Sequence, residues 1–213
     1  MPSLEFFKRL GLFVVGDFLD AERCAQLCSE VLASPTTQGQ VASDTSQEGG
    51  RVDESRRRVL CAEVPKSTTL LLRSRLMQLK PSLEGHFQVS LNACDGPHFL
   101  QYGPGNFYTP HRDVDAGSPD HILGRQVSII VFLNPSTQDP AFEGGYGGGA
   151  LTFYGLLQGE QWEKCAFSLD ASPGLLVAFR PNVLHEVKPV TFGQRLTVAA
   201  WFTSDSSQTS AAS

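Results

Sequence analysis

The sequence contains no C-x-x-C pair, because its five cysteines stand at positions 24, 28, 61, 94 and 165. The set is odd in number and lacks the spacing of a zinc module or a redox dithiol. We therefore expect reduced, mostly buried thiols. Cys24 and Cys28 are interpreted as small core residues rather than as a reactive pair.

Long hydrophobic runs are also missing. The apolar stretch "LGLFVV" near the N-terminus is interrupted by Gly16 and Asp17. Such a stretch is too short for a signal sequence or a membrane span. We expect a cytoplasmic protein with no membrane partner.

An excess of basic residues is absent as well. The chain has 17 Lys and Arg against 22 Asp and Glu, a formal net charge of -5. Bulk attraction to a phosphate backbone is not expected from this balance, and no basic stripe with stacking aromatics is visible. We expect no nucleic-acid partner, and the oligomeric state stays open.

The length and composition predict one domain. A chain of 213 residues with 41% hydrophobic residues can fill a single core. We expect one domain over residues 1–203, with a flexible C-terminal tail at 204–213, where only small and polar residues occur. Residues 34–50, which are rich in Ser, Thr, Gln and Gly, are interpreted as a mobile loop.

The pattern of apolar residues changes along the chain. The stretch "LFVVGDFL" predicts a buried strand. The stretch "DAERCAQLCSEVLAS" that follows predicts a helix capped by Asp20. One face of this helix would be formed by Cys24, Leu27, Cys28, Val31 and Leu32. A second helix is predicted from Ser67 to Leu79, interrupted near Pro81, as a support for a sheet. After residue 96, short apolar runs alternate with Gly and Pro turns, which is typical of a β-sandwich or jelly roll.

Arg56, Arg57 and Arg58 form the longest run of one charge. Two interpretations stay open for this run. It can be a solvated strand edge, or it can guide a passing peptide.

The motif His111-Arg112-Asp113 in "YTPHRDVD" has two candidate meanings. A kinase catalytic loop needs an Asn five residues after the Asp, together with an earlier glycine-rich loop and a strand lysine. Position 118 is Ser, and the glycine-rich stretch "GGYGGG" follows the motif. The kinase interpretation is therefore rejected.

The second meaning is a metal site. His111 and Asp113 are two residues apart, a spacing that points both side chains to one face of an extended strand. Pro110 favours extended chain there, because it disfavours helix at Thr109. His185, in the apolar pattern "VLHEVKPV" near the other end of the barrel, supplies a third ligand. Two imidazoles and one carboxylate form the facial triad of non-haem Fe(II) enzymes.

Arg195 follows His185 by ten residues, past the turn "KPVTFG". A hairpin would return it to the cavity beside the metal. A guanidinium fork in a dry pocket suits a carboxylate better than any other side chain.

At this point the sequence resembles the Fe(II)- and 2-oxoglutarate-dependent dioxygenases, and among them the prolyl 4-hydroxylase type. The resemblance rests on His111-x-Asp113, His185 and Arg195, on "YGPGNFYTPHRD", and on "RQVSIIVFLN", "FEGGYGGGALTFY" and "GLLVAFRPNVLHEVKPVTFGQRLTVAAWF". It is specific over residues 97–203. It implies an α+β, mostly β fold with a distorted double-stranded β-helix (jelly-roll) core and N-terminal helices packed on one sheet.

The resemblance also implies roles for particular residues. Its cofactors would be Fe(II), 2-oxoglutarate and O2, with ascorbate as a further candidate. Tyr102 would hydrogen-bond the cosubstrate, and the residues that match substrate-facing positions are Tyr108, Arg125 and Trp201. The chain departs from the family at Phe132, where relatives commonly place a tyrosine for the distal carboxylate, so that Arg195 and Tyr102 would carry more of the affinity.

The remaining histidines, His86, His98 and His121, are interpreted as core or surface residues. The cluster "EGGYGGG" is interpreted as a flexible barrel turn rather than a phosphate cradle, since no Lys-Ser/Thr follows it.

Three functions are weighed. The first is a hydroxylase of prolyl residues in a peptide or protein, which releases succinate and CO2. The second is a hydroxylase of a free amino acid or small metabolite, and a cysteine-free, aromatic-lined cavity would suit either. The third is a jelly-roll metal-binding sensor module without turnover, which Phe132 favours.

Overall fold

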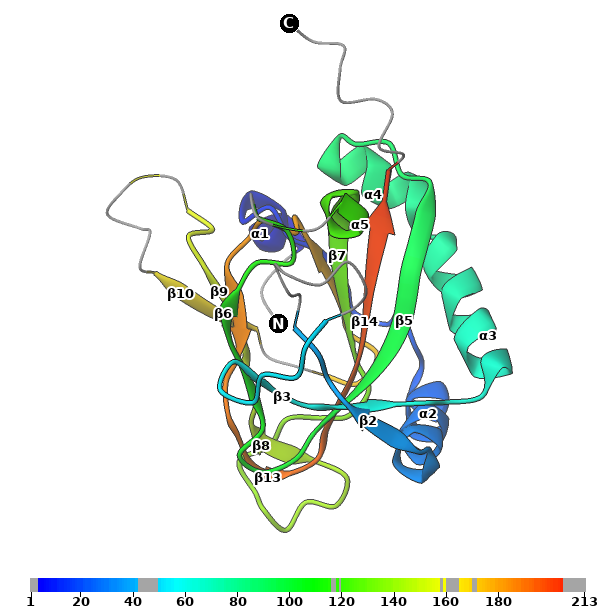
Figure 1. The fold of residues 1–213 in the computed structure, drawn as a ribbon, viewed down its shortest axis with the longest axis vertical. Coiled ribbons are helices and arrows are strands. Elements are labelled where there is room, and N and C mark those ends of the chain that lie inside the picture. The colour runs from blue at the N-terminus through cyan, green and yellow to red at the C-terminus, as the bar shows by residue number, and fades with distance from the viewer. Residues whose placement is uncertain are drawn as a thin grey trace, which may run out of the picture.

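Two facing β-sheets form the centre of the molecule, and helices cover the outer side of the larger sheet (Figure 1). The computed structural model describes residues 4–41, 50–115, 118, 120–157, 159, 165–169 and 172–204. In this part of the chain the larger sheet has seven strands in the order β1-β11-β7-β14-β5-β4-β2. The smaller sheet has five strands in the order β10-β9-β12-β6-β3, and β13 and β8 form a separate pair.

The helices and strands alternate along the first half of the chain, whereas strands dominate the second half. Their bounds are α1 Leu4–Arg9, β1 Phe13–Val15, α2 Ala21–Ala33, β2 Thr36–Gln38, β3 Arg57–Arg58, β4 Leu60–Ala62, α3 Lys66–Met77, α4 Lys80–Phe87, β5 Ala93–Tyr102, β6 Phe107–His111, α5 Asp120–Leu123, β7 Arg125–Phe132, β8 Tyr146–Gly148, β9 Leu151–Tyr154, β10 Ala166–Leu169, β11 Leu176–Phe179, β12 His185–Val187, β13 Val190–Gly193 and β14 Arg195–Thr203.

Helix α2 begins as its sequence predicts. The Asp20 side chain accepts a hydrogen bond of 2.7 Å from the backbone N–H of Arg23, which satisfies one free donor of the first turn. Cys24, Leu27 and Val31 are buried against the larger sheet, and Cys28 is partly buried. The prediction that Leu32 shares this face is wrong: Leu32 is 54% exposed, because the stripe turns away from the sheet at the end of the helix.

Helices α3 and α4 confirm the predicted support for a sheet. Leu72 and Leu76 of α3 and Leu83 of α4 are buried in the same core as the outer face of the large sheet. Pro81 does not simply interrupt a helix. It lies in the first turn of α4, where its missing N–H costs no hydrogen bond.

The strand-rich second half confirms the predicted mostly β, α+β jelly-roll architecture. The long strands β5, β7 and β14 lie side by side in the centre of the larger sheet, with β14 paired to both neighbours. Their alternating side chains contribute to three clusters of buried hydrophobic residues. One cluster lies against α2, α3 and α4, and the other two lie on the side of the smaller sheet.

The interpretation of residues 34–50 as one mobile loop is wrong at its start. Thr36–Gln38 forms strand β2, which pairs with β4 at the edge of the larger sheet, and Val41 bridges to Arg51. Residues 42–49 lie outside the described residues. The predicted tail at 204–213 also falls outside them except for Ser204, and stays a prediction.

The five cysteines are free. Cys24 and Cys94 are buried and Cys165 is exposed, so the expectation of buried thiols holds for part of the set. None of the described helices combines the length and the apolar character that a bilayer crossing requires.

Candidate metal and cosubstrate site

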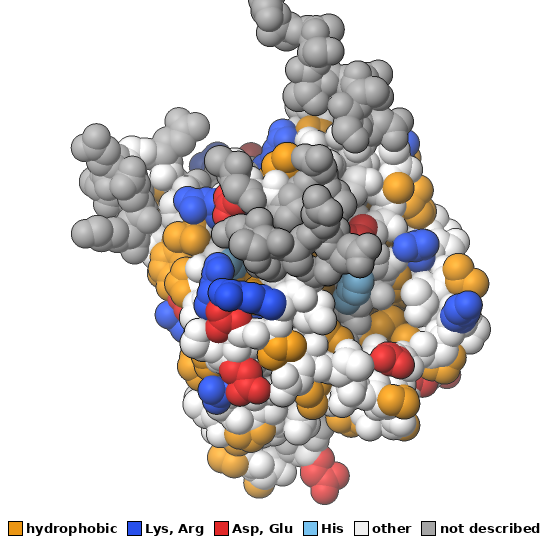
Figure 2. Space-filling model, viewed as in Figure 1, with side chains coloured by type: hydrophobic (Ala, Val, Ile, Leu, Met, Phe, Trp, Pro, Cys, Tyr) orange, Lys and Arg blue, Asp and Glu red, His pale blue; other side chains and the backbone are white. Residues whose placement is uncertain are grey.

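A cavity of about 580 Å³ opens between the two sheets. The residues that line it come from β5, β6, β7, β12 and β14, with further ones from β2, β3, β4 and β9. On the face seen in Figure 2, histidine side chains are visible, and Lys and Arg side chains gather beside one of them. The cavity brings together all the residues that the sequence predicts for metal and cosubstrate.

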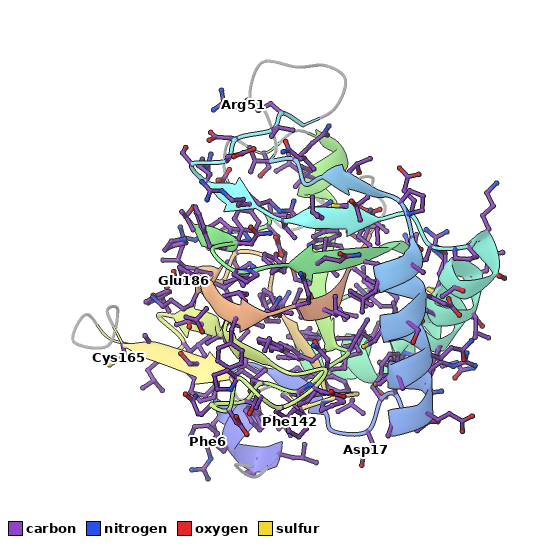
Figure 3. The ribbon with its side chains drawn as sticks, turned by 90° about the horizontal axis from the view of Figure 1, so that it is seen from below. Phe6, Asp17, Arg51, Phe142, Cys165 and Glu186 are labelled. Carbon is purple, nitrogen blue, oxygen red and sulfur yellow. The ribbon has the colours of Figure 1, made fainter. Side chains whose placement is uncertain are left out.

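His111 and His185 are direct partners in the strand pair β6–β12. Their ring centroids lie 4.2 Å apart, and both side chains are buried. The expected position of His185 near the other end of the barrel is therefore wrong. Glu186, the next residue of β12 and labelled in Figure 3, does not line the cavity and contacts Tyr154 and Lys188 instead, because side chains alternate across a strand.

Each of these imidazoles is held by the backbone. Nδ1 of His111 lies 2.8 Å from the carbonyl oxygen of Thr109, and Nδ1 of His185 lies 2.9 Å from that of Val183. A carbonyl only accepts hydrogen bonds, so both Nδ1 atoms carry the proton. The unprotonated Nε2 atoms are thereby free to bind a metal, as in metal sites with an oriented second shell.

Asp113 completes the group. Its Oδ1 lies 3.8 Å from Nε2 of His111, and its Oδ2 lies 3.9 Å from Nε2 of His185. One ligand atom from each of the three residues falls within 4.8 Å of the others, the only such His, Cys, Asp and Glu group found in the described part of the chain. The Ser128 hydroxyl donates a 2.6 Å hydrogen bond to Oδ2 and fixes the carboxylate.

The electrostatics suit a divalent cation. Burial and the neighbouring His185 lower the pKa of His111 to about 3, although Asp113 acts in the opposite sense. Burial acts to raise the pKa of Asp113, but the two imidazoles and the Ser128 hydroxyl outweigh it, so that the pKa is lowered. Near neutral pH the site thus offers a neutral imidazole and a carboxylate, the forms that bind metals. The donor set fits the two-histidine, one-carboxylate triad of Fe(II).

Arg195 lies in the same cavity with only 1% of its surface exposed. Arg195 lies on β14 of the larger sheet, whereas His185 lies on β12 of the smaller sheet. The predicted hairpin between the two strands is therefore wrong, and Arg195 lines the cavity from the sheet opposite His185. Arg195, Thr197, Ala199 and Trp201 all line the cavity, which settles the inward face of β14.

The guanidinium of Arg195 has no carboxylate partner among the described residues, and its Nε is buried without a hydrogen bond. Its Nη1 donates to the Thr197 hydroxyl at 3.2 Å. Its Cζ lies 5.0 Å and 5.3 Å from the ring centroids of Tyr102 and Phe132. A buried cation without a paired anion is energetically costly, so this position is suited to binding an anion.

Tyr146 lies beside the Arg195 side chain. Its ring is buried, which raises the pKa of its hydroxyl, while a hydrogen bond with Arg195 and the charge of that residue act to lower it. Tyr146, which lies on β8, thus acts as a brace: its hydroxyl helps to hold the Arg195 guanidinium in place. Sequence reasoning missed it because Tyr146 lies inside the glycine-rich cluster.

The cluster "EGGYGGG" is not a flexible turn throughout, since Tyr146–Gly148 forms β8 and pairs with β13. A Cβ at Gly147 would lie 2.1 Å from the Phe192 ring, and one at Gly149 would lie 2.9 Å from Cδ of Arg195. Gly149 also has a φ of +61°. These glycines let β8 approach β13 and leave room for Arg195, which explains their presence without a phosphate.

Tyr102 and Tyr108 both line the cavity. Tyr102 is buried and pairs with Arg195 across β5 and β14. The Tyr108 ring stacks on the His111 ring at 3.4 Å between centroids and 14° between planes. Burial raises the pKa of Tyr108 to about 12, so it stays a neutral phenol.

Arg125 and Trp201 lie together at the mouth. The Arg125 guanidinium lies 3.8 Å from the centroid of the Trp201 ring, and it forms a 3.1 Å ion pair with Asp95. His98 stands 3.5 Å from the same carboxylate and 5.5 Å from Trp201 between ring centroids. His98 and Asp95 are therefore cavity residues that sequence reasoning missed, and the interpretation of His98 as core or surface is incomplete.

Two further expectations change. The cavity is not free of cysteine, because Cys61 of β4 lines it. His86 packs outside it, against Phe13 and Phe87, as expected for a core residue. The His121 side chain lies outside the described residues.

Comparison with known proteins agrees with this geometry. The family model of the 2OG-Fe(II) oxygenase superfamily matches residues 97–203, which is half of the chain and includes the whole triad and Arg195. Two curated relatives each match about half of the chain. A PKHD-type hydroxylase of Sphingopyxis alaskensis is 33% identical over 109 residues, 51% of this chain and 44% of the relative. One from Thermosynechococcus vestitus is 36% identical over 104 residues, 48% of this chain and 40% of the relative. The chain thus spans less than half the length of these relatives.

Solved structures share the fold. A prolyl-4-hydroxylase of Pseudomonas putida superimposes with a TM-score of 0.67 at 21% identity, covering 94% of this chain and 96% of that one. A prolyl hydroxylase of Trichoplax adhaerens, solved in complex with a hypoxia inducible factor oxygen degradation domain peptide fragment, has a TM-score of 0.71 at 19% identity, covering 94% and 86%.

Proposed function

Because the chain belongs to the 2OG-Fe(II) oxygenase superfamily, we propose that it hydroxylates prolyl residues in a peptide or protein. The observation that carries the proposal is the convergence of His111, Asp113 and His185 in one cavity with an unpaired Arg195. A triad without a nearby cation could bind a metal for many purposes. A triad with a buried guanidinium is suited to a dicarboxylate cosubstrate.

His111, Asp113 and His185 would hold Fe(II) through two Nε2 atoms and a carboxylate oxygen. Bound iron with 2-oxoglutarate and O2 supplies the oxidation that places a hydroxyl group on a C–H bond and releases succinate and CO2. The chain prepares this site in advance, because Thr109, Val183 and Ser128 fix the three ligands before metal arrives. Ascorbate would serve as an external reductant.

Arg195 would bind the distal carboxylate of 2-oxoglutarate. Thr197 adds a hydroxyl at its Nη1, and Tyr146 braces it from the glycine-rich strand. Tyr102 would donate a hydrogen bond to the cosubstrate from the neighbouring strand β5. The sensor alternative depends on Phe132 as a lost cosubstrate contact. The buried Arg195, which has no carboxylate partner among the described residues, favours the enzyme instead.

Tyr108, Arg125 and Trp201 would contact the substrate. All three line the same cavity as the triad. The Trichoplax relative binds a peptide, which supports a peptide substrate here. The volume of the cavity, about 580 Å³, also suits a free amino acid or small metabolite, which is the second candidate.

Incubation of the protein with Fe(II), 2-oxoglutarate and a library of proline-containing peptides in air tests the proposal. We expect succinate formation and one added oxygen atom on a proline by mass spectrometry. Oxygen added only to a free amino acid supports the second candidate. No succinate under any condition contradicts both.

A further inference from the structure

We propose that Arg57 binds a carboxylate carried by the substrate, close to the position that is oxidised. This inference rests on the proposed function, since it concerns which substrates enter the same cavity. It narrows the substrate class to molecules with an acidic group: a peptide with Asp or Glu beside the target residue, or a free amino acid with its α-carboxylate.

Arg57 differs from the other arginines in its run. Its side chain lines the main cavity and also borders a separate surface pocket, whereas that of Arg58 is half exposed, lies near Glu54 and borders the surface pocket alone. Strand β3 pairs Arg57 directly with Tyr108 of β6. The solvated-edge interpretation therefore fits Arg58, and the guiding interpretation fits Arg57.

The Arg57 guanidinium is poorly compensated. Its Nε is buried without a hydrogen-bond partner in the described part of the chain, and its one hydrogen bond there runs from Nη1 to the carbonyl oxygen of Gln40 at 2.5 Å. No carboxylate of the described residues lies within ion-pair distance of it. A guanidinium has five N–H donors, so most of its capacity is unused. An unpaired, partly buried cation is costly, and an incoming anion would offset that cost.

The position of Arg57 points to substrate. Its Cζ lies 4.9 Å from the centroid of the Tyr108 ring, and the Tyr108 ring is stacked on His111 at 3.4 Å. His111 covers one face of the tyrosine ring, so the guanidinium lies over the other face. A carboxylate bound at Arg57 would therefore lie near the triad, on the far side of Tyr108 from His111.

Other anions of the reaction have their own partners. One carboxylate of 2-oxoglutarate would lie at the metal and the other at Arg195, which comes from the opposite sheet. Among the cavity acids, Asp95 pairs with Arg125, and Asp113 belongs to the triad. Arg57 is left for an anion that the substrate brings.

The local chain makes room for this side chain. A Cβ at Gly39 would lie 3.4 Å from Cζ of Arg57 and 2.3 Å from Cγ1 of Val59. The glycine therefore avoids a clash with Val59, and a Cβ at this position would only touch the guanidinium. The ring of Tyr108 holds the cation by a cation–π contact while no anion is bound.

Matched carboxylate and carboxamide probes test the inference. Dye-labelled, end-capped peptides that carry Glu or Gln beside a central Pro are titrated into protein with Fe(II) and 2-oxoglutarate under anaerobic conditions, and binding is read by fluorescence anisotropy. L-proline and L-prolinamide are compared as competitors. Tighter binding of the Glu peptide than of the Gln peptide would indicate recognition of an acidic side chain. Tighter binding of L-proline than of L-prolinamide would indicate recognition of an α-carboxylate. We expect one carboxylate probe to bind about tenfold to a hundredfold more tightly than its carboxamide.

Two variants locate the effect. In Arg57→Gln the carboxylate and carboxamide probes should bind about equally. Arg58→Gln removes a positive charge from the same strand and should keep the preference for the carboxylate probe. Arg57→Lys keeps the cation and should retain part of the preference. A preference that persists in Arg57→Gln, or no preference in either pair with the native protein, overturns the inference.

The readouts separate this inference from the proposed function. Preference in anaerobic binding with no succinate in air contradicts the hydroxylase and supports the anion site. Succinate and hydroxylated peptide with equal binding of Glu and Gln probes and of proline and prolinamide supports the hydroxylase and contradicts the anion site.

Discussion

His111 and His185 face each other across one rung of the β6–β12 strand pair, and each directs its Nδ1–H to the carbonyl oxygen of the residue two positions before it. The two histidines are thus held by the same local device on antiparallel strands. Both Nε2 atoms point to the Asp113 carboxylate. Because backbone carbonyls hold the rings, the ligand geometry depends on the sheet and not on mobile side chains.

Ser128→Ala should weaken metal binding by about tenfold to a hundredfold. The substitution removes the 2.6 Å hydrogen bond to Oδ2 of Asp113 and leaves the carboxylate free to rotate. Anaerobic Fe(II) titration measures the dissociation constant. Ser168→Ala is the control. Among the described residues the Ser168 hydroxyl bonds only to the Thr152 hydroxyl, and Ser168 does not line the cavity. Equal affinity of the two variants would contradict the role of Ser128.

Arg195→Lys should raise the 2-oxoglutarate concentration needed for half-maximal succinate formation by about tenfold to a hundredfold. A lysine keeps the charge but cannot form two parallel hydrogen bonds to a carboxylate. Arg73→Lys serves as the control, since Arg73 donates to the Gly96 carbonyl outside the cavity. An unchanged requirement in Arg195→Lys would place the cosubstrate elsewhere.

Tyr146→Phe should raise the same half-maximal concentration by a smaller factor, about threefold to tenfold. The ring still fills its buried position, so only the hydroxyl at Arg195 is lost. Tyr154→Phe removes a hydroxyl that bonds Glu186 instead and should leave the requirement unchanged. If both variants behave alike, Tyr146 is not a brace for Arg195.

Asp95 predicts a pH effect on stability at the cavity mouth. Hydrogen bonding to His98 and the charges of His98 and Arg125 lower its pKa from 3.8 to about 2, against the opposing effect of burial. A carboxylate whose folded pKa is depressed stabilises the fold above its ordinary pKa and loses this effect as pH falls toward the folded value. The excess unfolding free energy of the native protein over Asp95→Asn should therefore shrink as the pH falls below about 4. Urea unfolding at stepped pH measures it, and a constant difference down to pH 2.5 would contradict the assignment.

The sequence was sufficient for the features that local patterns encode. The strand periods after residue 96 predicted the jelly roll, and the two-residue spacing of His111 and Asp113, with His185 and Arg195 in order, predicted which residues share the cavity. The Asp20 cap and the buried stripe of α2 follow from helix chemistry that needs no distant partner.

Features that depend on strand register and distant packing could not be predicted. The direct pairing of His111 with His185 requires the register of β6 and β12, which no local pattern fixes. Strand β2 is exposed at all three residues and shows no alternation, and β8 consists largely of glycine, so neither resembles a strand. The positions of Cys61, Tyr146 and Arg57 follow from those pairings.

Anaerobic equilibrium binding of Fe(II) tests the central claim most directly. The account predicts about one tightly bound Fe(II) per native chain, loss of that binding in Asp113→Gly and His185→Ala, and retention in His86→Ala, whose ring packs against Phe13 and Phe87 outside the cavity. Undiminished binding in Asp113→Gly and His185→Ala would contradict it.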